Sequence, residues 1–127
     1  MKIVRGADIS FIPASHEDPK DPGTYKKVLF NRDDFGEGHV QMINWAKMPA
    51  GKAFQLHYHE TLAEIFVIIK GQAALKVDEE EIILAPGDAV RIDADEKHEM
   101  KTVGSEDVEY VVMGISTGEQ GKTVVIS

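Results

Sequence analysis

Residues 51–71 read GKAFQLHYHETLAEIFVIIKG, and this stretch decides both the fold and the kind of site that the chain builds. In an extended strand, side chains two positions apart point to the same side, so His57 and His59 can present two imidazoles toward one interior. Glu64 opens a run that is otherwise apolar, where an unpaired buried carboxylate is costly and a cation relieves the cost. Neutral imidazoles and a carboxylate suit a divalent transition metal ion.

The whole chain has the size and composition of one globular domain. Its 127 residues (14.0 kDa) include 43% hydrophobic residues, which is ample for a single packed core. No apolar run approaches the roughly 18 residues that a membrane span needs, and the start MKIVRGADIS lacks the profile of a secretory signal. We therefore expect a soluble, cytoplasmic protein. The absence of cysteine excludes disulfides, thiolate metal ligands and thiol nucleophiles.

The charge balance bears on the partners. The chain has 22 acidic and 14 basic residues, for a net charge of −8. A strongly acidic protein lacks the basic surface that attracts nucleic acid or anionic lipid, so we expect neither a nucleic acid nor a membrane as partner. A small molecule is the expected partner.

The pattern along the chain is typical of an all-β protein. Residues 1–24 carry three prolines among polar residues, which predicts an N-terminal arm that is irregular or holds one short edge strand around 9–12. Residues 25–127 form the expected barrel domain, in which short β-prone segments alternate with turn signals, as in an antiparallel sandwich or barrel. The expected strands are 25–30, 40–48, 53–59, 64–69, 73–77, 81–84, 89–92, 98–103, 108–115 and 123–126. The apolar run at 64–69 predicts a strand buried on both faces.

Two spacings resemble the sequence motifs of the cupin family. The first motif is matched by the positions of Gly51, His57, His59, Glu64 and Gly71. The second is matched by the turn Pro86-Gly87-Asp88 with His98 downstream, so the resemblance covers about residues 51–102. It implies a double-stranded β-helix, the jelly-roll barrel of cupins, as a single domain with one metal ion inside. The ligands that it implies are His57, His59, Glu64 and His98.

The second motif departs from the family pattern. Asp93 stands where the family usually has proline, Asp95 where it usually has glycine, and Thr102 at the final asparagine position. None of these changes removes a ligand. A solvated loop histidine is the alternative for His98.

Other residues near the expected ligands are candidates for the lining of the site. Gln55 shares the expected strand face of His57 and His59, where it either hydrogen-bonds a ligand or stands at the barrel rim. Three further residues share the faces of Glu64 or His98, and core packing explains them equally well: Phe66, Ile68 and Met100. No general acid or base is identified, with Glu96 the single guess. His16 and His39 are expected at the surface.

The resemblance leaves two classes of function open. Four protein ligands leave coordination positions for water, oxygen or a bidentate substrate, which favours a small metalloenzyme. Similar single-domain cupins act as dioxygenases, decarboxylases and isomerases on carboxylates, enols or hydroxyl compounds, with manganese, iron, nickel or zinc. The alternative is a non-catalytic module that binds or senses a small ligand. A homodimer is also expected, because jelly rolls have edge strands to cover and both terminal segments are β-prone.

Overall fold

The computed structural model describes residues 1–15, 17–22, 25–35, 39–116 and 122–126, so His16 lies outside it. Strands are the main regular structure of these residues, and the helices among them are two single turns, η1 (Gly6–Asp8) and α1 (Arg32–Phe35). No helix in the described part of the chain is long and apolar enough to cross a membrane. The strands are β1 (Lys2–Val4), β2 (Ile12–Pro13), β3 (Tyr25–Lys26), β4 (His39–Met48), β5 (His57–Glu60), β6 (Leu62–Lys70), β7 (Gln72–Val77), β8 (Glu80–Leu84), β9 (Ala89–Ile92), β10 (His98–Val103), β11 (Val108–Ser116) and β12 (Lys122–Val125).

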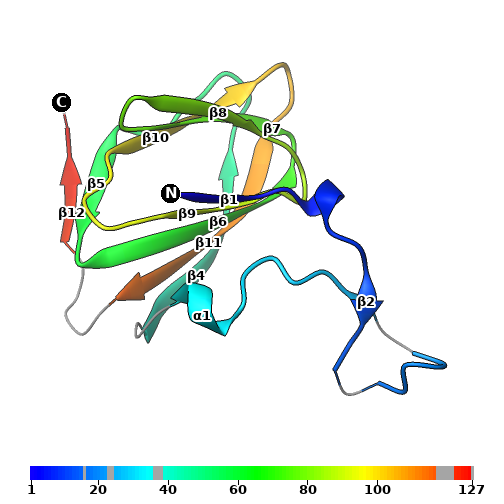
Figure 1. Ribbon diagram of the computed structural model, residues 1–127. Coiled ribbons are helices and arrows are strands. Elements are labelled where there is room, and N and C mark those ends of the chain that lie inside the picture. Colours follow the sequence, from blue (N-terminus) through cyan, green and yellow to red (C-terminus); the bar gives the residue numbers. More distant parts are fainter. Residues whose placement is uncertain (16, 23–24, 36–38, 117–121, 127) are drawn as a thin grey trace.

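Two five-stranded antiparallel sheets face each other and form the body of the protein (Figure 1). The strand order is β1-β9-β6-β11-β4 in the first sheet and β12-β5-β10-β7-β8 in the second. Consecutive strands repeatedly change sheets, as β5 and β6 do, which is the connectivity of a jelly-roll barrel. The predicted all-β fold is therefore confirmed. A two-stranded ribbon, β2 with β3, projects from the body (Figure 1).

The core lies between the two sheets. Strand β6 is central in its sheet, between β9 and β11, and is buried on both faces, as its apolar sequence predicts: Ile65 is 3%, Phe66 3% and Ile68 1% exposed. The facing sheet contributes Leu75 from β7 and Met100 from β10, both fully buried. Burying such side chains contributes roughly 1.5–3 kcal/mol each to folding, so this interior is what holds the two sheets together.

The segment before the two histidines differs from the prediction. A strand was expected at 53–59, but regular pairing begins at His57. Residues just after Gly51 still bond to β10, through the N–H of Phe54 and the carbonyl of Met100 (3.0 Å). The pairing around Ala53 is a single bridge to Lys101, after which the chain leaves the line of a strand. Side-chain alternation therefore cannot be carried from His57 back to residue 53.

The N-terminal region also differs from the strands that the sequence predicts. Strand β1 pairs with β9, which the sequence pattern did not predict, because three residues are too short to show an alternation. The edge strand expected around 9–12 is β2, which begins only at Ile12, and the strand expected at 25–30 is limited to Tyr25–Lys26. The arm thus contributes an edge strand to the main sheet through its first residues.

Candidate metal centre

The structure brings the four proposed ligands together inside the barrel. One ligand atom from each residue lies within 4.8 Å of the corresponding atoms of the other three. His59 is 9%, Glu64 5% and His98 1% exposed, whereas His57 is half-buried. A divalent ion bound at about 2.1 Å from each donor places those donors about 3–4 Å apart, so a small inward shift of the most distant donors lets all four reach one ion. We refer to these residues as the His/Glu cluster: His57, His59, Glu64 and His98.

Both sheets contribute to the cluster. Strand β5 supplies two histidines, and its neighbour β10 supplies the third, with His57 and His98 directly opposite each other in the register. Glu64 comes from β6 in the facing sheet, where its partners are Gly114 and Ile92. The chain passes from β5 to β6 within one residue, Thr61, whose φ of 56° turns it sharply between the sheets. Residues that are close in the sequence, His57 and His59 on one side and Glu64 on the other, therefore lie on opposite sheets and face each other across the interior.

Backbone carbonyls fix the orientation of two imidazoles. The Nδ1 atom of His57 lies 2.5 Å from the carbonyl oxygen of Gln55, and Nδ1 of His98 lies 2.9 Å from that of Glu96. A carbonyl only accepts hydrogen bonds, so in both rings the Nδ1–H donates and Nε2 is turned toward the cluster. This is the arrangement in which an outer partner fixes the tautomer of a metal-binding histidine.

The carboxylate of Glu64 lies at the centre of the cluster. Its Oε1 is 2.8 Å from Nε2 of His59 and 3.1 Å from Nε2 of His98. Burial raises the pKa of this carboxyl, but with no ion between the groups, Nε2–H donors of His59 and His98 outweigh burial and lower the pKa from 4.5 to about 2. Burial lowers the pKa of His57 and thereby favours its neutral form. At neutral pH the cluster therefore contains an ionised carboxylate and an imidazole that resists protonation.

Of the four residues proposed to line the site, three are buried in the interior and one is exposed. Phe66 and Ile68 lie on the inner face of β6, and Met100 on the inner face of β10; all three are buried in the core. Gln55 is exposed, and its contact with the cluster is made by its carbonyl group. The reason is the irregular path of residues 53–56, which makes Phe54 the inward side chain of this segment.

Two aromatic residues near the cluster were missed by the sequence analysis. The ring of Phe54 lies 5.2 Å from that of His57 and 6.1 Å from that of His98, measured between centroids. Tyr110, on β11, packs edge-on against Phe66 at 5.5 Å and is 9% exposed. Burial, and then the charge of Glu64, raises the pKa of its hydroxyl, so that it stays protonated at neutral pH. The apolar character of Phe54 was a usable signal, whereas nothing local indicated Tyr110.

Glu96, suggested above as an acid or base, uses its carboxylate for other contacts in the structure. Its carboxylate accepts the N–H of Asp93 (2.8 Å) and lies 3.2 Å from the amino group of Met1. These contacts hold the turn between β9 and β10, and it is the carbonyl of Glu96 that contacts the cluster. His39 is exposed, as predicted.

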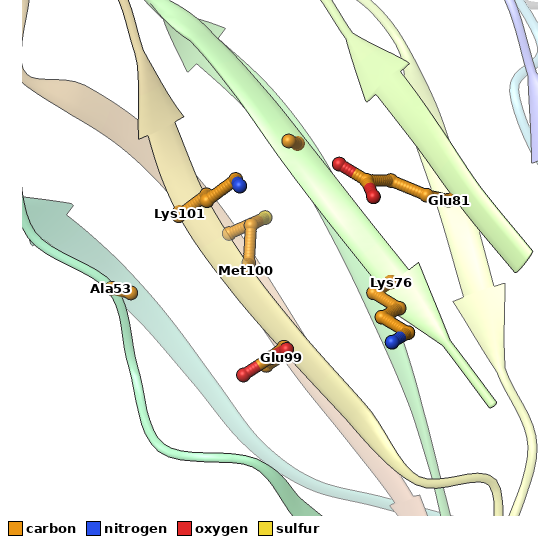
Figure 2. Close-up of a pocket in the computed structure, with 7 residues that line it drawn as sticks. Ala53, Lys76, Glu81, Glu99, Met100 and Lys101 are labelled. Atoms are coloured by element: carbon orange, nitrogen blue, oxygen red, sulfur yellow. The ribbon is translucent and has the colours of Figure 1, made fainter. Parts of the chain in front are cut away.

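A recess of about 100 Å³ lies on the outer side of the second sheet (Figure 2). Its charged side chains are Lys76, Glu81, Glu99 and Lys101. Lys76 is the cross-strand partner of both Glu81 and Glu99, so opposite charges alternate across three strands. Such pairs stabilise a sheet, and the recess contains no residue of the His/Glu cluster.

Comparison with known sequences links the chain to one family. The family model described as a cupin domain matches residues 44–114, more than half of the chain. Among curated proteins, an "oxalate-binding protein" of Thermotoga maritima is 28% identical over 67 residues, which are 53% of this chain and 55% of that protein. An uncharacterised protein of Methanocaldococcus jannaschii is 29% identical over 69 residues, 54% of this chain and 55% of that protein. The chain thus spans about half the length of the curated relatives it matches.

Solved structures show the same fold. A cupin protein from Bacteroides fragilis has a TM-score of 0.57 at 25% identity, covering 61% of this chain and 67% of that chain. A protein of T. maritima described as a "predicted oxalate decarboxylase" has a TM-score of 0.59 at 22% identity, covering 89% of this chain and 97% of that chain.

Proposed function

The chain belongs to the cupin family, and on that premise we propose that it binds a divalent transition metal ion in the His/Glu cluster and uses it to act on a small oxygen-bearing molecule. The substrate class is a carboxylate, an enol or a hydroxyl compound. Manganese, iron, nickel and zinc all suit a donor set of three imidazole nitrogens and one carboxylate oxygen.

One observation carries the proposal, namely the surroundings of His98. Its Nδ1 faces the carbonyl of Glu96 at 2.9 Å, and its Nε2 faces the carboxylate of Glu64 at 3.1 Å. Because both neighbours are acceptors, the ring either carries two protons or shares Nε2 and the carboxylate with a cation. A metal ion gives both Nε2 of His98 and the carboxylate of Glu64 a positively charged partner. It also accounts for the close approach of three imidazoles, whose ring centroids lie 4.4–5.6 Å apart.

The residues of this chain have separate parts in the proposed activity. A bound ion supplies the Lewis acidity that polarises an oxygen of the substrate. The carbonyls of Gln55 and Glu96 hold two imidazoles in orientation, while Phe54 and Phe66 keep water from the inner side of the cluster. The protonated hydroxyl of Tyr110 is the group that we propose as hydrogen-bond donor to a bound substrate.

A second candidate function is ligand binding without turnover. It is favoured by the name of the curated T. maritima relative, "oxalate-binding protein", which describes binding and not a reaction. The two functions are separated by incubating the metal-loaded protein with carboxylates, catechols and sugars, with and without oxygen. Release of carbon dioxide, consumption of oxygen or formation of an isomer supports the enzyme, whereas saturable binding with unchanged ligand supports the binding module.

The proposal is tested by the metal content of the purified protein. We expect close to one equivalent of a transition metal after expression without added metal, or after dialysis against the ion, measured by elemental analysis. A His57→Ala variant is expected to lose most of it, and a His39→Ala variant, which removes an exposed histidine, is expected to keep it. Absence of bound manganese, iron, nickel and zinc from the wild-type protein under both conditions contradicts the proposal.

Acidification is expected to release the metal as the imidazoles become protonated. Glu64, with a pKa of about 2, stays ionised down to low pH, so its protonation is not what releases the ion. Burial lowers the pKa of His57 below the ordinary histidine value of about 6.5, so protonation of this ligand and release of the ion should require a pH below that value. A metal indicator dye follows the titration. Release that begins only near pH 3 would assign the step to the carboxyl group instead.

A further inference from the structure

Large apolar side chains that face solvent gather at two places in the structure. Ten are exposed among the described residues, and six of these lie either on or next to the projecting ribbon or on strand β4. We call the first group the ribbon patch, which consists of Phe11, Ile12 and Tyr25. The second group is the β4 patch, which consists of Val40, Ile43 and Trp45. The ribbon stands apart from β4 (Figure 1), so neither patch covers the other within one chain.

The β4 patch lies on the outer side of the first sheet. Trp45 and Ile43 stand opposite Val111 and Met113 of β11, which are half-buried and alternate with side chains of the core. Val111 in turn stands opposite Val67 of β6, so the apolar surface continues across three strands. An antiparallel sheet that packs one face on the core ordinarily presents polar side chains on the other. An outer face of this composition indicates that another apolar surface covers it.

The chain itself covers only the far side of this face. The carbonyl of Asp34 in α1 accepts a hydrogen bond from Arg91 of β9 (2.7 Å), and the carboxylate of Asp34 contacts Lys2 of β1. Ile65, the cross-strand partner of Arg91, is accordingly 3% exposed, whereas Trp45 is 69% exposed. The uncovered apolar surface is therefore at the β4 side of the sheet.

Strand β4 is also an unprotected edge. In the described part of the chain it is the last strand of its sheet, and its ten residues include no proline, no acidic residue and one lysine, Lys47. Most proteins blunt such edges with charges or proline, because a free edge pairs with other chains. The ribbon has the opposite problem, since two strands of two residues each are marginal in water on their own. Each element lacks a neighbour that the other can supply.

The exposed area of the two patches fits an interface between two copies of this chain. Phe11, Tyr25 and Trp45 are 64%, 54% and 69% exposed, and an aromatic side chain covers about 150–250 Å², so these three present about 300–450 Å². A standard interface takes about 800 Å² from each partner, of which about 450 Å² is apolar. One patch supplies only part of that area, whereas both patches together supply it.

We propose that two copies associate about a two-fold axis, with the ribbon patch of each copy packed on the β4 patch of the other. A two-fold axis makes both contacts at once, because each copy offers both surfaces. The net charge of −8 opposes an anionic lipid surface as the alternative occupant. The proposal concerns surfaces outside the His/Glu cluster and does not rest on the proposed function.

Analytical ultracentrifugation of the full chain is expected to show a dimer, twice the 14.0 kDa of one copy, at micromolar concentration. Trp45→Glu and Phe11→Glu should each weaken the dimer at least about 30-fold, because each places a charge in an apolar contact. The matched control is Ile83→Glu, which adds the same charge to an exposed apolar position of β8, in the other sheet, and should leave the dimer unchanged. Circular dichroism checks that all three variants keep the β fold.

Cross-linking distinguishes exchange of the ribbons from packing of like patches. The chain has no cysteine, so Ser10→Cys beside the ribbon patch and Lys47→Cys beside the β4 patch each introduce a single thiol. The two variants, one of them carrying an affinity tag, are mixed, equilibrated and treated with a short bismaleimide. The mixed pair is expected as the main cross-linked product.

Three results would overturn the proposal. The first is a wild-type monomer at high micromolar concentration, even if the monomer then binds lipid vesicles or another protein. The second is a dimer that survives both the Trp45→Glu and the Phe11→Glu substitution. The third is a Lys47→Cys variant that cross-links to itself while the mixed pair is absent. Since none of these measurements requires a bound metal, failure here leaves the proposed metal site untouched.

Discussion

Replacement of Glu64 by glutamine is expected to weaken metal binding by at least about 100-fold, although the side chain keeps its shape. The substitution removes the only carboxylate of the His/Glu cluster, and loss of a group that merely orients a ligand already costs 10–100-fold in other metal sites. The thermal stabilisation by metal should disappear with it. At a metal concentration of about 100 times the Kd, that stabilisation is about 2.7 kcal/mol. Calorimetry and thermal unfolding with and without Zn²⁺ measure both effects.

The matched control for this change is Glu99→Gln. Glu99 is adjacent to His98 on β10, but its side chain points to the outer face of the sheet, where it lines the recess beside Lys76 (Figure 2). The same loss of charge there should leave metal affinity within about twofold of the wild type, since Glu99 lies on the outer face of the sheet, away from the His/Glu cluster. If both variants lose metal equally, the effect comes from overall charge and the Glu64 carboxylate is not a ligand.

The second large effect is expected at Gly71, where alanine should destabilise the fold by about 3 kcal/mol or more. Gly71 has a φ of 79°, which costs an alanine about 1–2 kcal/mol. A Cβ at this position would also stand 2.3 Å from the backbone carbonyl oxygen of Asp107, which cannot move without displacing the start of β11. Overpacking against backbone adds a further 1–3 kcal/mol. Urea unfolding of the metal-free protein measures the change.

Gly51 provides the control for Gly71. It has the same φ of 79°, but a Cβ there would meet no atom within 4 Å. Gly51→Ala should therefore cost only the backbone strain of about 1–2 kcal/mol. Equal destabilisation by the two substitutions would show that close packing against Asp107 contributes nothing.

The sequence predicted those features that depend on the spacing of residues close to one another in the chain. Alternation placed His57 and His59 on one side, and the cost of burying Glu64 in an apolar run indicated a nearby positive group. The apolar composition of residues 64–69 predicted a strand covered on both faces, which the central position of β6 confirms. The jelly-roll fold followed from strand periodicity together with the motif resemblance.

Other features depend on pairings between distant segments, which a single sequence does not show. Tyr110 enters the interior because β11 pairs with both β6 and β4. Phe54 replaces Gln55 as the inward side chain because the chain before His57 bonds only briefly to β10. The motif likewise treats Gly51 and Gly71 alike, although only the latter lies against another part of the backbone.

Anomalous diffraction from crystals of metal-loaded protein locates the bound ion among the side chains. We expect a single strong peak at the absorption edge of the ion, about 2.0–2.3 Å from Oε1 of Glu64 and from Nε2 of each of the three histidines. A metal-loaded crystal with no peak inside the His/Glu cluster, or with its ion bound elsewhere on the chain, would contradict the account.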